Sequence, residues 1–167
     1  MVCRVSETKP SIVVEDLSPE LFAEVMPLAQ KCWDESTTLK GENCAFYGER
    51  EFKIEPFYEM YEQLAKSGLL VVVTLRDEGV LVGYVIGFSY RTLHHKHIVA
   101  GIGDSIYIEP DFRAYTPFVA KVFENEMAKR GAQIIGWPTQ ENGPVYEFLK
   151  SMGYVGDDIV MEKRLCV

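Results

Sequence analysis

The sequence has few cysteines and histidines, fewer basic than acidic residues, and no long apolar run. None of its four cysteines belongs to a C-x-x-C pair, so the cysteine spacing indicates neither a disulfide framework nor a metal site. The longest apolar run, residues 69–73, is far too short to cross a bilayer. Residues 1–10 are polar and lack the apolar core of a signal peptide. We therefore expect a polar N-terminal tail, free thiols and a cytoplasmic protein.

The deficit of basic residues limits the kinds of molecule that the protein is expected to bind. Seventeen Lys and Arg stand against 25 Asp and Glu, which gives a net charge of −8. Nucleic acids and anionic membranes require a basic surface, so neither is an expected partner, whereas a cationic amine is favoured. The sequence also has no internal repeat, P-loop, dinucleotide fingerprint or Ser-His-Asp spacing. His95 and His97 lie two residues apart but lack a third candidate metal ligand.

What the sequence does contain is a succession of strand and helix patterns over residues 11–167, a length that fits a single domain. The predicted order is β-α-α-β-β-β-α-β-α-β, a mixed α/β fold with antiparallel hairpins first and a strand–helix–strand unit later. The predicted strands are residues 12–14, 69–75, 80–90, a strand ending at 105–108, 133–137 and 159–165. The predicted helices are residues 19–34, 56–67, 116–130 and 144–152.

Several local signals add detail to this order. Ser18 precedes Pro19 as a good N-cap, and Pro27 is expected to kink or split the first helix. Residues 36–53 follow no period and are predicted to form a long ordered loop, of the kind that often serves as a lid. Gly83 and Gly87 share one face of a strand, which leaves room there for another backbone or a ligand.

Residues 105–131 join a strand, a short turn and a capped helix, a unit that can present unsatisfied backbone N–H groups to an anion. Residues 107–113 read Tyr-Ile-Glu-Pro-Asp-Phe-Arg, a hydrophobic-x-Pro-x-x-Arg sequence. Residues 142–154 match the pattern N-x-x-A-x-x-x-Y-x-x-x-G-F at Asn142, Gly153 and Tyr154. In these segments and in its order of elements the chain resembles the GNAT superfamily of N-acetyltransferases.

The resemblance implies a GNAT-like fold, in which helices flank a mixed, mostly antiparallel central sheet, and it implies acetyl-CoA as the co-substrate. In this family the fourth strand offers backbone groups to the pantetheine arm, and a glycine-rich loop, here residues 111–118, binds the diphosphate. By this correspondence the cofactor-binding residues are Ile106, Tyr107, Ile108, Arg113, Ala114, Tyr115, Thr116, Phe118 and Asn142.

The loop departs from the family pattern. Thr116 and Phe118 stand at the two glycine positions, and Pro117 removes one backbone N–H, so at least one hydrogen bond to the diphosphate should be missing. A hydrogen bond to a charged group contributes about 1.5–3 kcal/mol. We therefore expect the affinity for acetyl-CoA to fall at least about tenfold, unless Arg113, Lys121 or Thr116 compensates.

The resemblance also suggests the catalytic residues. The family uses a carboxylate on the central strands to deprotonate the substrate ammonium, and the candidates are Asp104 and, second, Glu109. Asp104 has the alternative role of a strand-end residue bonded to the backbone. The family's tyrosine, which protonates the leaving thiolate, aligns with Leu149. Tyr146, one turn earlier, would replace it only in a shifted helix and is otherwise a half-buried aromatic.

Two functions are consistent with these residues. The first is an N-acetyltransferase that moves an acetyl group from acetyl-CoA to an amine of a small molecule or a protein. The second is a catalytically degenerate GNAT-fold protein with a binding or structural role, similar in style to GNAT-like chains of bacteriophage genomes. The altered loop and Leu149 favour weakened chemistry, whereas Arg113 and the strand signature favour the enzyme. Because the fold commonly pairs its C-terminal strands, a homodimer through the last strand is also an expectation.

Overall fold

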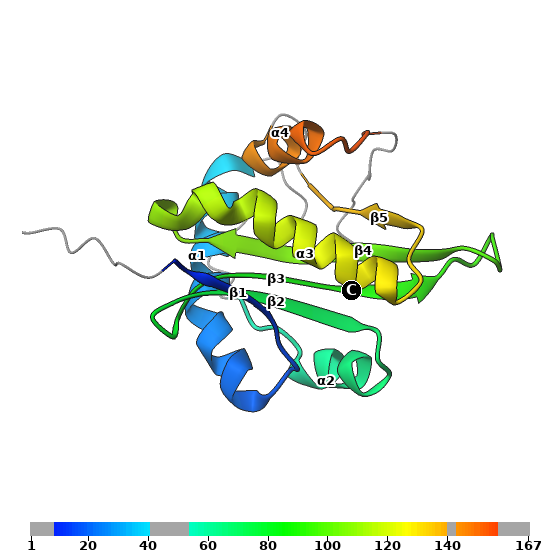
Figure 1. Ribbon diagram of the computed structural model, residues 1–167, viewed down its shortest axis with the longest axis horizontal. Coiled ribbons are helices and arrows are strands. Elements are labelled where there is room, and N and C mark those ends of the chain that lie inside the picture. The colour runs from blue at the N-terminus through cyan, green and yellow to red at the C-terminus, as the bar shows by residue number, and fades with distance from the viewer. Residues whose placement is uncertain (1–8, 41–53, 140–142, 157–167) are drawn as a thin grey trace, which may run out of the picture.

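The computed structural model describes residues 9–40, 54–139 and 143–156 and shows a five-stranded sheet with helices on both faces (Figure 1). The strands are β1 (Ser11–Val14), β2 (Leu70–Asp77), β3 (Val80–Arg91), β4 (Val99–Ile108) and β5 (Ile134–Gly136). The helices are α1 (Pro19–Lys40), α2 (Tyr58–Lys66), the 3-10 helix η1 (Pro110–Tyr115), α3 (Thr116–Lys129) and α4 (Pro144–Ser151). The strands lie in chain order, β1 to β4 antiparallel and β5 parallel to β4, which confirms the predicted mixed α/β architecture.

The β2–β3 hairpin is determined by its turn. Asp77 pairs with Val80, so Glu78 and Gly79 alone form the loop, and both have positive φ angles, 50° and 85°. Two positive φ angles in a two-residue loop are the mark of a type I′ turn, whose twist matches that of the flanking strands. The antiparallel hairpin expected from the predicted strands 69–75 and 80–90 is therefore confirmed.

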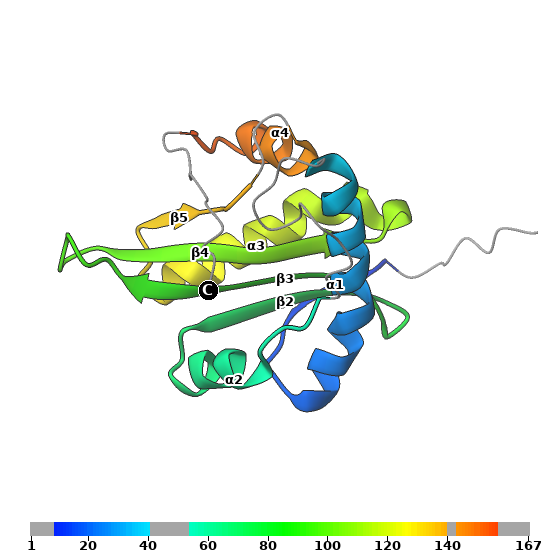
Figure 2. The same cartoon turned by 180° about the vertical axis from the view of Figure 1, so that it is seen from behind.

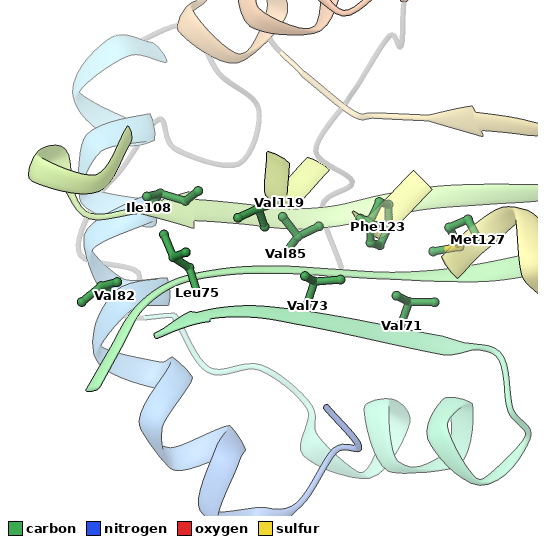
Figure 3. Packing of buried hydrophobic residues seen from close by; sticks show 9 residues of the cluster. All are labelled: Val71, Val73, Leu75, Val82, Val85, Ile108, Val119, Phe123 and Met127. Atoms are coloured by element: carbon green, nitrogen blue, oxygen red, sulfur yellow. The ribbon is translucent and has the colours of Figure 1, made fainter. Parts of the chain in front are cut away.

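Each face of the sheet has its own hydrophobic core. On one face Val71, Val73 and Leu75 of β2 pack with Phe123 and Met127 of α3, all fully buried (Figure 3). On the other face, side chains of β2, β3 and β4 pack against α1 and α2 (Figure 2). Because successive side chains of a strand point to opposite faces, a strand covered on both sides needs a continuous apolar run, and β2 has one.

The start of α1 follows the sequence signals closely. The Ser18 hydroxyl oxygen accepts a hydrogen bond from the Leu21 N–H at 3.1 Å, which satisfies one of the free donors of the first turn. Pro27 lies inside the helix without ending it, so the predicted split does not occur. The helix runs on because Leu28 and Ala29, directly after the proline, are buried against the sheet.

The end of α1 differs from the prediction. The helix continues to Lys40, so the predicted loop over residues 36–53 is wrong for residues 36–40. Local periodicity ends near Asp34, whereas the helix continues beyond it, and Glu35, one residue later, forms an ion pair with Arg113 of η1. Residues 41–53, the rest of the predicted lid, lie outside the described residues, and α2 begins at Tyr58, two residues after the predicted Pro56.

The glycine face of β3 is filled by protein. A Cβ added at Gly87 would lie 2.2 Å from the Ile102 carbonyl oxygen and 2.6 Å from Cζ of Phe123. At Gly83 an added Cβ would lie 2.8 Å from Cγ1 of Ile108. Of the two occupants predicted for this face, a backbone or a ligand, the structure shows the neighbouring strand and helix α3, so these glycines allow close packing.

The C-terminal part of the chain is described only to residue 156. β5 occupies three residues of the predicted strand 133–137. The predicted strand 159–165, the homodimer contact that it suggested, and Asn142 all lie outside the described residues. Of the helices within the described ranges, none combines the length and the hydrophobicity that a membrane crossing requires.

Candidate active site at the bulge of β4

β4 contains a β-bulge at Asp104. In its register with β3, Ser105 lies opposite Ile86 and Gly103 lies opposite Gly87, so Asp104 is the extra residue. A bulge bends the strand locally and re-aims the side chain of the extra residue. Asp104 is exposed, so the bulge presents a carboxylate at the surface of the sheet. The sequence placed Asp104 near this strand but carried no signal for the bulge.

β4 loses its second neighbour just before the bulge. β5 pairs with β4 from Ala100 to Ile102, and the last pair joins Ile102 to Gly136. Within the described ranges, no strand pairs with this edge of β4 from Gly103 to Ile108. An unpaired strand edge is a place where an extended ligand with amide groups can add through backbone hydrogen bonds.

Two tyrosines reach β4 from the side of α1 and α2. The Tyr61 hydroxyl of α2 donates a hydrogen bond to Asp104 Oδ2 at 2.6 Å. The hydroxyls of Tyr84 on β3 and Ser105 on β4 share a hydrogen bond of 2.7 Å. Burial raises the pKa of both tyrosines, and for Tyr61 the hydrogen bond and the charge of Asp104 raise the pKa further. Both phenols are therefore protonated at neutral pH.

The predicted pantetheine-binding residues of β4 alternate between the two cores. Ile106 and Ile108 belong to the α3 side, whereas Tyr107 is buried on the α1 side. Two of their backbone oxygens already have side-chain donors: Cys32 Sγ lies 3.5 Å from the Ile106 oxygen and Arg113 Nε lies 3.3 Å from the Ile108 oxygen. The role of these residues in cofactor binding stays a prediction.

The predicted diphosphate loop is helical. η1 runs directly into α3, and the Thr116 N–H bonds to the Arg113 carbonyl oxygen, to which Thr116 Oγ1 also donates at 2.8 Å. Pro117 has no N–H, so the first two positions of α3 offer no free backbone donor to an anion. The usual GNAT diphosphate contacts thus cannot all form in this conformation.

The rest of the predicted loop is only partly covered, since Phe112 and Tyr115 pack against the core on the α3 side. Ala114 and Phe118 are exposed, and the Tyr115 and Phe118 rings lie 6.4 Å apart between centroids. Lys121, named as a compensating cation, forms an ion pair with Glu124 of the same helix at 2.8 Å. An anion at this end of α3 would therefore compete with Glu124 for that lysine.

Arg113 is engaged by α1. Its Nη2 atom donates to both oxygens of Glu35, at 2.9 and 2.7 Å. The Tyr107 hydroxyl also donates to Glu35, at 3.2 Å. Burial raises the pKa of Tyr107 to about 12, and the charges of Glu35 and Glu109 add to the rise. The positive charge that the sequence assigned to the diphosphate is therefore balanced by a carboxylate.

A second ion pair lies one turn away. Lys31 of α1 binds Glu109 at the exit of β4, just as Glu35 binds Arg113 in η1. The two pairs have opposite polarity: α1 supplies the cation in the first and the carboxylate in the second. Glu109 forms an ion pair with Lys31, and its role as second candidate base stays a prediction.

The last helix places a leucine where the family has its tyrosine. Leu149 is buried, 5% exposed, and is a core residue. Tyr146 is half-buried, and the Lys150 ammonium lies 5.3 Å from the centre of its ring. Tyr154, one of the matching motif positions, donates to Glu124 of α3 at 3.0 Å, so it ties the end of α4 to α3.

Sequence reasoning missed two residues of this site, Tyr61 and Glu35. The helical pattern marks Tyr61 only as part of an apolar face, and no local signal points to a partner 43 residues away. Glu35 falls between the predicted helix 19–34 and the predicted loop 36–53 and was assigned no role. For metals the result is simple: no group of three or more candidate ligands occurs in the part of the chain that the structure describes.

Comparisons with known proteins rest on structure alone. No family model matches the sequence, and no curated protein sequence matches it either. Three solved structures are similar over nearly the whole chain. A ribosomal-protein-alanine N-acetyltransferase from Brucella melitensis has a TM-score of 0.64 at 18% identity and covers 95% of this chain and 100% of its own. AAC(6')-Iy, in complex with the bisubstrate analogue CoA-S-monomethyl-acetylneamine, has a TM-score of 0.64 at 10% identity. The match covers 93% of this chain and 99% of AAC(6')-Iy.

The third structure, the BH1408 protein from Bacillus halodurans, has a TM-score of 0.72 at 12% identity and covers 92% of this chain and 99% of its own. At such identities structural likeness indicates a shared fold, whereas activity depends on the residues of the site. The sheet order, the parallel β4–β5 pair and these likenesses together establish that this protein has the GNAT fold.

Proposed function

We propose that this protein is an acetyl-CoA-dependent N-acetyltransferase that acts on an amine of a small molecule or a protein. One observation carries the proposal: the exposed Asp104 carboxylate stands at a bulge of β4, next to the point where β5 leaves that strand. This arrangement puts a proton acceptor beside an edge of β4 that no described strand covers. In the similar AAC(6')-Iy structure a CoA-derived analogue is bound. The expected location in the cytoplasm is part of the same proposal.

The open edge of β4 fits one end of acetyl-CoA. Its backbone N–H groups from Gly103 to Ile108 would donate to the amide oxygens of the pantetheine arm and to the thioester oxygen, which favours attack on the carbonyl carbon. The oxygens of Ile106 and Ile108 already accept from Cys32 and Arg113, so a ligand would have to share or replace those donors. The diphosphate end fits less well, because Arg113 already pairs with Glu35. Binding of that end therefore requires Arg113 to exchange one anionic partner for another.

Asp104 would serve the acceptor amine. Asp104 takes one proton from the substrate ammonium, which frees the nitrogen lone pair to form a bond to the acyl carbon as the carbon–sulfur bond breaks. The new amide nitrogen then gives up its second proton, and the thiolate gains one. Tyr146 of α4 is the candidate group for this second transfer, since its hydroxyl can donate to the sulfur and recover a proton from the nitrogen. Glu109 is the second candidate for the proton acceptor, although its pairing with Lys31 makes it less available.

A second function, that of a GNAT-fold protein without catalysis, is favoured by a specific pair of observations. The predicted diphosphate loop is helical with its arginine paired to Glu35, and Leu149 fills the tyrosine position. Such a protein would keep the fold and use it for binding or a structural role. The two proposals differ in one measurable property, which is affinity for acetyl-CoA.

Thermal unfolding with and without acetyl-CoA distinguishes them. A dissociation constant near 10 µM gives roughly 2.7 kcal/mol of stabilisation at 1 mM ligand, or a rise of about 5–10 °C in melting temperature. Release of free CoA in the presence of an aminoglycoside, a polyamine or a peptide with a free N-terminus then tests turnover. A melting temperature that does not move with 1 mM acetyl-CoA would rule out the enzyme and leave the non-catalytic protein.

A further inference from the structure

We propose that Tyr61 is a positioning residue, which holds one oxygen of the Asp104 carboxylate and leaves the other for a cationic amine acceptor. This inference deepens the proposed acetyltransferase function and rests on it. Its basis is the 2.6 Å hydrogen bond from the Tyr61 hydroxyl to Asp104 Oδ2, which joins α2 to the bulge of β4. A bulge residue has lost its regular place in the strand ladder, so its side chain needs a partner outside the strand to keep one orientation.

The Tyr61 ring is itself held in place. It packs against the core on the α1 side of the sheet, and its centroid lies 6.1 Å from that of Phe22 of α1. Tyr58, one turn earlier on α2, makes an edge-to-face contact with the same Phe22 at 4.9 Å. Because the ring is anchored by both the core and Phe22, its hydroxyl marks a fixed point to which Asp104 is tied.

Tyr61 occupies only half of the carboxylate. Its bond is to Oδ2, and no described residue donates a hydrogen bond to Oδ1 or forms an ion pair with Asp104. An ionised carboxylate can accept about four hydrogen bonds. An exposed carboxylate with a free oxygen and no cationic neighbour among the described residues is suited to a substrate that brings its own positive charge. A protonated amine is such a substrate.

Tyr61 is the donor in its hydrogen bond with Asp104. Besides Asp104, Tyr84 of β3 also acts on the Tyr61 phenol and raises its pKa, and the Tyr84 hydroxyl is itself hydrogen-bonded to Ser105. Burial and Asp104 both raise the pKa of Tyr61, so the phenol remains a donor at neutral pH. The proton given up by the amine therefore goes to Asp104 and not to Tyr61.

A double-mutant cycle tests this role, with acetyl transfer to a polyamine as the readout. Tyr61→Phe should lower kcat/KM for the amine about tenfold or more, because the carboxylate loses a hydrogen bond of the charged class, and it should leave acetyl-CoA affinity unchanged. In an Asp104→Asn background the same substitution should have no further effect, since Tyr61 acts through Asp104. Tyr58→Phe is the matched control, with the same chemistry on the same helix, and should behave as wild type.

Two results would overturn the inference: independent, multiplying effects of Tyr61→Phe and Asp104→Asn, or an equal loss in Tyr58→Phe. A wild-type protein that binds no acetyl-CoA would instead overturn the proposed function. A double-mutant cycle of unfolding free energies in urea separates these failures without turnover. Tyr61→Phe and Asp104→Asn should be coupled, because both remove the same hydrogen bond. Additive free energies would show that the contact itself is absent.

Discussion

Replacing Glu35 with glutamine should tighten the binding of acetyl-CoA, although it removes a native contact. Glu35 holds Arg113 through two hydrogen bonds and also accepts one from Tyr107. If Arg113 binds the diphosphate, Glu35 competes with the ligand for it. Glutamine keeps the size and the polarity of the side chain but removes the charge that attracts the guanidinium, so the arginine becomes easier to recruit.

The exposure of the pair sets the size of this effect. The side chains of Arg113 and Glu35 are 52% and 50% exposed, so solvent screens the attraction between them. Pairs of this kind contribute about 0.2–1 kcal/mol, which corresponds to a gain in affinity of about 1.5- to 5-fold. Arg113→Ala should act in the opposite direction and weaken binding at least about tenfold, because it removes a charge-assisted bond.

Isothermal titration with CoA at low and at high salt measures both effects. The gain in Glu35→Gln should shrink at high salt, since salt screens the competing ion pair. Glu24→Gln is the matched control: Glu24 lies on the same helix, is 49% exposed and binds Arg76 rather than Arg113. It should leave CoA affinity unchanged.

The reasoning would be refuted by weaker CoA binding in Glu35→Gln or by an equal gain in Glu24→Gln. The first result would mean that Glu35 supports the binding conformation of η1. The second would mean that the overall negative charge of the protein, and not one contact, limits the affinity for an anionic ligand.

Three further predictions concern stability. Phe123→Ala should cost about 3–5 kcal/mol in urea unfolding, because Phe123 is fully buried between the sheet and α3. Gly87→Ala should cost about 1–3 kcal/mol in the same assay, as its Cβ would lie 2.2 Å from the Ile102 oxygen. The hydrogen bond from Arg76 lowers the pKa of Glu15, so this pair stabilises the protein above the unfolded pKa of about 4.5 and the benefit disappears as pH falls through the lower folded value. In Glu15→Gln the free energy of unfolding should therefore decrease less steeply as pH falls into the acidic range. A decrease as steep as in the wild type would show that the Glu15–Arg76 pair does not contribute to the pH dependence.

The elements of the fold were predictable where their signals are local. The Ser18 cap, the type I′ turn at Glu78-Gly79 and the continuous apolar run of β2 each depend on residues close together in the chain. Local reasoning failed at the end of α1, where the helix continues past Asp34 and Glu35 binds Arg113 of η1. A pattern of hydrophobic spacing carries no information about polar contacts with residues far away in the chain.

The candidate site was predictable only as a set of residues. Asp104, Arg113 and the strand between them were identified from the sequence, but their partners were not. Asp104 is bound by Tyr61, 43 residues away, and Arg113 by Glu35, 78 residues away. Neither partner has a spacing or motif that distinguishes it from an ordinary helical residue.

The sequence by itself determined the order of the described strands and of the four α-helices, together with the β2–β3 hairpin, because these follow from periodicity and turn chemistry within a few residues. The tertiary structure alone decided that Asp104 stands at a bulge with one oxygen held by Tyr61, and that Glu35 neutralises Arg113. The physical reason is that side-chain partners in a folded sheet are set by which helix crosses which strand. That geometry arises only when the whole core packs.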